Sequence, residues 1–287
     1  MARPVIALLT DFGMRDHYAG TMKGVALGIC PDATLVDITH DIPPHDVMTG
    51  ALELAASYKY FPAGTIFLVV VDPGVGSARR GIAADAGGYR FVAPDNGVLT
   101  LALKDPAPKR VVELTERRYT RPTVSRTFEG RDRFAPAAAW LAKGIELTGL
   151  GRTLTSWHLL SIPEPAVSEN QIVAEVLRVD RFGNLVTNVD RRAFERFAEG
   201  GHFEVTAGPH PVGKVVATYS EAEPGSVCAL FGSTEHLEVA VNGASAAEKL
   251  QLRRGARILI SRSDRSDGSD RSNRSVPPDR SVRTDRS

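Results

Sequence analysis

Residues 65–71 read Thr-Ile-Phe-Leu-Val-Val-Val and form the most strand-like run of the chain. A continuous run of apolar and β-branched residues is typical of a strand that is covered on both faces. Two shorter runs, 4–9 and 34–38, predict further strands before it, and the patterning of 17–30 predicts a helix between them. Strands that alternate with helices in this way indicate a mostly parallel sheet.

The alternation continues on both sides of residues 65–71. Asp46 is a candidate N-cap for a helix that runs toward Tyr58, and 130–143 predicts an alanine-rich helix. We therefore expect an α/β domain with a mostly parallel sheet over residues 1–163. Ligands bind such sheets at the carboxyl ends of the strands.

The pattern changes after residues 164–170, which have the composition of a linker. Short runs separated by Gly, Pro and Asn predict a smaller all-β domain, a barrel or a sandwich, over residues 171–261. Its expected strands are 172–179, 185–188, 203–206, 214–219, 227–230, 237–241 and 256–260. Residues 262–287 form an Arg-, Ser- and Asp-rich tail without aromatic residues, a composition typical of disorder.

Charge and composition argue against several classes of function. The 287 residues carry 35 Lys and Arg against 34 Asp and Glu, a net charge of +1 with neutral histidine. This balance gives no electrostatic footprint for nucleic acid or for a membrane surface. No run approaches the roughly 18 apolar residues of a spanning helix. The two cysteines, Cys30 and Cys228, stand outside any metal-type spacing, so we expect a cytoplasmic protein without a metal site.

Two candidate site residues follow expected strands. Asp11 comes just after the first strand, where a carboxylate accepts two hydrogen bonds and suits a ribose diol. A turn or helix-capping aspartate is an equally good interpretation. Asp72 follows residues 65–71 in the segment Val-Asp-Pro-Gly-Val-Gly and could form an ion pair with Arg79. The residues alone slightly favour an ordinary structural pair over a catalytic one.

Two further segments carry candidate side chains. Glu129 stands at a loop-to-helix junction, a usual place for functional residues, although a first-turn carboxylate is also favoured by the helix dipole. Phe182 and Asn184 open the β-rich part, where a phenylalanine could stack on a base and an amide could read its edge. The same residues could equally form a hairpin turn.

Taken together, these segments resemble the S-adenosyl-L-methionine (SAM) hydroxide adenosyltransferases, the adenosine-forming SAM hydrolases related to fluorinase and chlorinase. The resemblance runs from about residue 4 to residue 260, and its order of motifs makes it specific. The motifs are Leu-Leu-Thr-Asp-Phe-Gly (8–13), Val-Asp-Pro-Gly-Val-Gly (71–76), Ala-Pro-Asp-Asn-Gly (93–97), Gly-Arg-Asp (130–132), Asp-Arg-Phe-Gly-Asn (180–184) and Gly-Ser-Thr-Glu-His-Leu-Glu-Val-Ala-Val-Asn (232–242).

The resemblance implies an N-terminal α/β domain, a C-terminal β-barrel and a homotrimer with SAM at the subunit interfaces. The implied reaction is attack of water or hydroxide on the ribose C5′ carbon, which forms adenosine and releases L-methionine. Since the sulfonium is a good leaving group, the site needs a positioned and desolvated nucleophile rather than a metal or a bound cofactor.

Matching motifs also assign residues. The resemblance implies that Asp11 holds the ribose hydroxyls. It further implies that substrate contacts come from the C-terminal part: Phe182, Asn184, Val241 and Asn242 at the adenine, and Asp180 and Ser233 at the methionine end.

The hydrolases of this family hold the attacking water with an Asp, Arg and His set. Asp72 and Arg79 match the first two members, whereas Glu129 stands where the family usually has His. A second carboxylate beside Asp72 should raise one pKa, which suits a general base, and should repel a halide. Two alternatives stay open: a halide-dependent enzyme that makes a 5′-halo-adenosine, and a SAM or adenosine sensor with little turnover.

Overall fold

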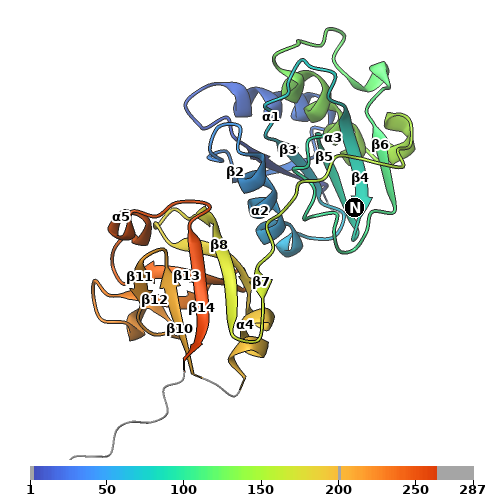
Figure 1. Ribbon diagram of the computed structural model, residues 1–287. Coiled ribbons are helices and arrows are strands. Elements are labelled where there is room, and N and C mark those ends of the chain that lie inside the picture. Colours follow the sequence, from blue (N-terminus) through green and yellow to red (C-terminus); the bar gives the residue numbers. More distant parts are fainter. Residues whose placement is uncertain (1–2, 200–201, 264–287) are drawn as a thin grey trace, which may run out of the picture. The chain divides into compact units, whose positions relative to one another are not determined.

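The computed structural model describes residues 3–199 and 202–263, and the chain divides after Ile162 into two compact units. The first unit contains a six-stranded sheet in the order β2-β1-β3-β5-β4-β6 (Figure 1). Its strands are β1 (Val5–Thr10), β2 (Thr34–Thr39), β3 (Ile66–Val70), β4 (Gly81–Ala86), β5 (Tyr89–Pro94) and β6 (Arg110–Glu113). The first three and β5 pair in parallel, and β4 pairs antiparallel with β5 and β6. The predicted α/β unit with a mostly parallel sheet is confirmed.

Helices cover both faces of this sheet. In β1, Ile6 and Leu8 belong to one apolar core together with α1 (Tyr18–Ile29) and α3 (Ala135–Ala142). Ala7 and Leu9 belong to a second core on the other face, together with α2 (Val47–Ser57). Every residue of β3 is buried, because this strand lies between the two cores. That position explains its unbroken apolar run.

Some local predictions for the first unit were incomplete. Asp46 caps α2 as predicted, with its side chain accepting from the Thr49 N–H at 3.0 Å. The run 130–143 is not one α-helix, since Gly130–Phe134 forms a π-helical turn before α3 begins. Strands β4 to β6 were not predicted. Short 3₁₀ turns cover Tyr58–Tyr60, Arg117–Tyr119 and Leu147–Leu150.

The second unit is an all-antiparallel sheet in the order β11-β10-β14-β8-β9-β13-β12, with β7 paired to β8. Its strands are β7 (Ala166–Val167), β8 (Gln171–Val179), β9 (Leu185–Asp190), β10 (His202–Ala207), β11 (His210–Val212), β12 (Val227–Phe231), β13 (His236–Val241) and β14 (Arg257–Ser263). The segment after β11 bridges to β12 through Val215 and Ala229, which brings the two ends of the sheet together. The predicted barrel-like all-β unit is confirmed.

The structure corrects four details of this second unit. The expected linker contains β7, which adds to the sheet beside β8. The segment 214–219 is not a strand, because it makes a single bridge and then turns into the 3₁₀ helix Tyr219–Glu221. Two helices, α4 (Arg191–Ala198) and α5 (Ala246–Leu250), were not predicted. Of the expected tail, residues 262–263 belong to β14, and the rest lies outside the described residues.

Within residues 3–199 and 202–263, no helix is long and apolar enough to cross a membrane.

Candidate active site

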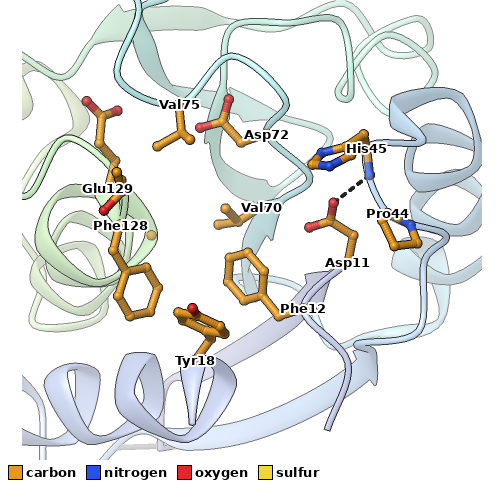
Figure 2. A pocket seen from close by; sticks show the side chains of 12 residues that line it. Asp11, Phe12, Tyr18, Pro44, His45, Val70, Asp72, Val75, Phe128 and Glu129 are labelled. Atoms are coloured by element: carbon orange, nitrogen blue, oxygen red, sulfur yellow. Dashed lines mark hydrogen bonds between the residues drawn. The ribbon is translucent and has the colours of Figure 1, made fainter. Parts of the chain in front are cut away.

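The parallel pairing of β1 and β3 places two carboxylates at one edge of the sheet. Thr10 pairs with Val70, so Asp11 and Asp72 both lie just beyond the carboxyl ends of neighbouring strands. A cavity of about 300 Å³ opens there. It is lined by Asp11, Phe12, Tyr18, Pro44, His45, Val70, Asp72, Val75, Thr127, Phe128, Glu129 and Gly130 (Figure 2). The position agrees with the general rule for ligands of α/β sheets.

The catalytic candidates Asp72, Arg79 and Glu129 form one buried cluster. Arg79 Nη2 donates to Asp72 Oδ2 at 2.5 Å and to Glu129 Oε2 at 2.7 Å. The side chains are 5%, 8% and 10% exposed for Asp72, Arg79 and Glu129. The Arg79 guanidinium also packs over the Phe134 ring at 5.3 Å. Charged side chains that are this deeply buried need partners of opposite charge, and here both carboxylates pair with Arg79.

The second oxygen of Asp72 is buried but unpaired. Oδ1 has no hydrogen-bond partner among the described residues, although Asp72 lines the cavity. Burial raises the pKa of this carboxyl, Arg79 lowers it, and the nearby charge of Glu129 raises it again; the net direction is upward. The Gly74 backbone N–H also faces the carboxylate and favours its charged form. Asp72 therefore brings to the cavity lining a carboxylate of raised basicity, one oxygen of which has no partner among the described residues.

The segment that carries Asp72 and Arg79 is held at both ends by the Ala-Pro-Asp-Asn-Gly motif. Asn96 Nδ2 donates to the Val71 carbonyl at 2.8 Å, directly before Asp72. Asp95 Oδ2 accepts from Arg80 Nε at 2.7 Å, directly after Arg79. Two consecutive residues thus fix the two ends of the loop between β3 and β4.

The Gly-Arg-Asp motif holds the turn that follows Glu129. Asp132 is fully buried and accepts from the Ser125 N–H at 2.8 Å and from Arg131 Nε at 2.6 Å. Gly130 packs against α1, where a Cβ would lie 3.1 Å from Met22 Sδ. These contacts place Glu129 at the start of the π-helical turn, facing Arg79.

Asp11 lies on a different side of the cavity. Its Oδ2 accepts from the His45 N–H at 2.8 Å, and His45 adopts a φ of 68° to make that contact. Figure 2 shows the rings of Phe12, Tyr18 and Phe128 gathered along another side. The centroids of Tyr18 and Phe128 are 5.0 Å apart in an edge-to-face arrangement. The cavity therefore combines one apolar side with separate carboxylates.

In the second unit, Asp180 organises its own loop. Its Oδ1 accepts from the backbone N–H groups of Phe182 and Asn184 at 2.9 and 2.8 Å, and its Oδ2 accepts from Asn184 Nδ2 at 2.9 Å. The turn needs Gly183, which has a φ of 84° and lies so close to Ser245 that a Cβ would meet its Oγ at 2.1 Å. Phe182 projects outward with 77% of its surface exposed. An outward phenylalanine on a fixed loop is available for stacking.

Two residues outside the predicted site, Tyr219 and Glu238, extend this loop. The Tyr219 hydroxyl donates to Glu238 Oε2 at 3.2 Å and lies 3.4 Å from Asn184 Nδ2. Burial, reinforced by the Glu238 charge, raises the pKa of Tyr219 to about 12. Burial also raises the pKa of Glu238, whose side chain lies in β13. The sequence feature that could have identified Glu238 is its position as the one charged residue in the apolar run Leu-Glu-Val-Ala-Val (237–241).

The remaining predicted binding residues are not gathered into one cluster. Ser233 is exposed in the turn between β12 and β13, whereas Val241 is the last residue of β13. The Val241 side chain is buried in the core of the second unit. Asn242 Nδ2 donates to the Ala222 carbonyl at 2.7 Å. A ligand at these positions would meet the backbone of Val241 rather than its side chain.

No group of three or more His, Cys, Asp or Glu side chains within the described part of the chain is arranged to hold a metal ion.

Comparison with known proteins identifies the family. The profile of the SAM hydroxide adenosyltransferase N-terminal domain matches residues 6–151, and that of the C-terminal domain matches residues 174–259. A Thermus thermophilus protein named (R)-S-adenosyl-L-methionine hydrolase is 42% identical, with 90% of this chain and 99% of that protein covered. A protein of the same name from Salinispora tropica is 38% identical over 90% of this chain and 98% of that protein.

More distant relatives and solved structures agree. A fluorinase from Nocardia brasiliensis is 29% identical, with 90% of this chain and 97% of that protein covered. The crystal structure of an uncharacterised conserved protein from Thermotoga maritima superimposes with a TM-score of 0.84 at 35% identity, covering 90% of this chain and 100% of that one. Because both family profiles match and the relatives align over nearly their whole length, the chain belongs to the SAM hydroxide adenosyltransferase family.

Proposed function

We propose that the protein hydrolyses (R)-S-adenosyl-L-methionine to adenosine and L-methionine. The support comes from two directions. Three relatives with this named activity are 36–42% identical over 90% of the chain, whereas three fluorinases are 27–29% identical. The single observation that carries the chemistry is the unpaired, buried Oδ1 of Asp72 at the cavity.

In this proposal Asp72 holds the attacking water. The water oxygen forms a bond to C5′ while the C5′–S bond breaks, and its electron pair leaves on sulfur as the neutral thioether of methionine. One proton of the water stays on the new 5′-hydroxyl and the other passes to Asp72. The raised pKa of Asp72 favours this transfer, and burial of the cluster keeps the nucleophile desolvated.

Arg79 and Glu129 orient that carboxylate. Arg79 donates to Oδ2 of Asp72, and we assign the water to Oδ1, which has no partner among the described residues. Glu129 Oε2 accepts a hydrogen bond from the same nitrogen, Arg79 Nη2. We assign Asp72 as the base and Glu129 as the anion that holds Arg79. Two carboxylates around the nucleophile position also disfavour a halide.

For substrate binding, we propose that Asp11 accepts hydrogen bonds from the ribose diol. The proposed contacts of the second unit are those of its outward loop and strand ends: Phe182, Asn184, Val241 and Asn242 at the adenine, and Asp180 and Ser233 at the methionine end. No metal or bound cofactor is assigned a role.

We further propose a homotrimer with the substrate at its subunit interfaces, on the basis of the family resemblance. Sedimentation velocity at several concentrations tests this state, and a monomer that turns over substrate would contradict it. We also propose a cytoplasmic location, because Cys30 and Cys228 are both free and buried.

The test of the proposed activity uses purified protein with the separated (R) and (S) epimers of SAM in ¹⁸O-labelled, chloride-free buffer. We expect adenosine that carries one ¹⁸O atom, together with unlabelled methionine, from the (R) epimer. A parallel sample with added halide separates the alternative. A 5′-halo-adenosine would reject hydrolysis as the main reaction, and bound substrate without product would indicate a sensor.

We expect Glu129→Gln to lower kcat by roughly ten- to a hundredfold while leaving the affinity for SAM within a few-fold. Arg79 loses the charged partner that fixes its guanidinium beside Asp72. The variant also removes one of the two influences that raise the pKa of Asp72. The acid limb of kcat/KM should therefore move to lower pH. Glu146→Gln, at an exposed position, is the control, and unchanged turnover in Glu129→Gln would refute this assignment.

A further inference from the structure

Glu129 has a second arginine beside it. Its Oε1 lies 3.7 Å from Arg133 Nη2, whereas its Oε2 accepts from Arg79 at 2.7 Å. The four side chains therefore form an alternating row of charges, Asp72–Arg79–Glu129–Arg133. The Glu129 side chain is only 10% exposed, so its carboxylate depends on partners within the protein, whereas the Arg133 side chain keeps 28% of its surface exposed.

We propose that Arg133 is a positioning residue of the reacting cluster, which holds Oε1 of Glu129 and thereby keeps Oε2 on Arg79. The proposal rests on the proposed hydrolysis and extends it to a residue outside the cavity lining. Arg133 does not contact the cavity, so its effect on the reaction passes through Glu129 and Arg79 to Asp72.

The local fold directs Arg133 toward Glu129. The two residues are four positions apart at the π-helical turn, so their side chains share one side of it. Gly81, at the start of β4, leaves room for this arrangement. A Cβ there would lie 3.2 Å from Arg133 Cδ and 2.7 Å from the Phe134 ring. Arg133 Nε is buried and finds no hydrogen-bond partner among residues 3–199 and 202–263. The acidic side chain that this guanidinium faces is Glu129, through Nη2.

The charge balance of the cluster gives a reason for the presence of Arg133. Asp72 and Glu129 share one arginine, which leaves the three-residue cluster with one excess negative charge in a buried place. An uncompensated buried charge is strongly unfavourable. Arg133 restores neutrality. Where the family resemblance expects His, the chain has Glu129, and the negative charge that this brings is balanced four residues later.

A kinetic double-mutant cycle tests the coupling. We expect Arg133→Met, which keeps the apolar stem, to lower kcat about five- to tenfold with little change in KM. Arg133→Lys should recover most of that loss. In a Glu129→His background, which removes the carboxylate, Arg133→Met should change kcat less than about twofold. Arg118→Met, at an exposed arginine paired with Glu116, is the matched control.

Two kinetic outcomes would overturn the proposal. One is an Arg133→Met variant that behaves like Arg118→Met. The other is an equal loss from Arg133→Met with either Glu129 or His at position 129, because that result would assign Arg133 a general structural role.

A stability cycle gives a readout that does not depend on turnover. We expect Arg133→Met and Glu129→Gln to shift the urea midpoint by less in combination than the sum of the two single shifts. Additive shifts would show that the two side chains do not interact and would reject the proposal. If the wild-type protein releases no adenosine, the hydrolase assignment fails, whereas this cycle still decides whether Arg133 holds Glu129.

Discussion

Asp72→Asn is expected to lower kcat about a thousandfold, the largest effect of any single substitution in this site. The amide has the same shape, and its oxygen can still accept from Arg79. Its NH₂ group would then face the water, donate where the carboxylate accepts, and take no proton. Affinity for (R)-SAM should stay within about fivefold, since none of the proposed ribose or adenine contacts changes.

The pH profile provides an independent check on Asp72. The carboxylate must be ionised to accept a proton, and burial together with Glu129 raises its pKa. Wild-type kcat/KM should therefore decline as the pH falls through that raised pKa. Asp72→Asn should lack this acid limb.

Single-turnover kinetics measure how much Asp72→Asn slows the chemical step, and calorimetric titration separately measures the affinity of this variant for (R)-SAM. Asp32→Asn is the control, since Asp32 is exposed between α1 and β2, at the opposite edge of the sheet from Asp72. Retention of wild-type turnover, or of the acid limb, in Asp72→Asn would remove Asp72 from the role of base.

For Asp11→Ala, we expect the dissociation constant of SAM to rise about a hundredfold. The variant loses two charge-assisted hydrogen bonds to the ribose diol, each worth about 1.5–3 kcal/mol before compensation by water. Asp11 also accepts from the His45 N–H, so part of the loss could come from a displaced loop. Asp11→Asn keeps an acceptor for His45 and should weaken binding only about tenfold.

A substrate analogue distinguishes the diol contact from the loop effect. The 2′-deoxy form of the substrate should bind the wild type less tightly than SAM does. Asp11→Ala should bind both with nearly equal affinity, because the partner of the missing hydroxyl is gone. Equal penalties for the deoxy analogue in both proteins, or an unaltered affinity in Asp11→Ala, would contradict the assignment.

Patterns confined to a few neighbouring residues predicted much of this protein. The run 65–71 predicted a strand covered on both faces, and β3 is buried throughout. Motif order predicted the family. The strand-like runs before Asp11 and Asp72 predicted that both residues lie at strand ends, and the pairing of β1 with β3 confirms it. These predictions succeeded because a strand that is buried on one or two faces has a recognisable apolar pattern in its own residues. The polar residue that follows such a strand is then read directly from the sequence.

Other features depend on contacts between distant segments. Strands β4 to β6 were not predicted, since runs such as Gly-Ile-Ala-Ala-Asp-Ala in β4 gain their strand conformation from pairing with neighbours. The segment 214–219 has strand-like residues but makes only one bridge. Local propensity is too weak to decide such cases, and tertiary pairing overrides it.

The sequence by itself determined the α/β and β-barrel classes, the family and the identity of the candidate side chains. Only the tertiary structure decided that Arg79 joins Asp72 to Glu129, fifty residues further along the chain, and that Arg133 faces the other oxygen of Glu129. It also decided that Glu238 meets Tyr219 beside the Asp180 loop. The physical reason is that charge pairing and burial depend on distances in space, and a one-dimensional pattern carries no information on those distances.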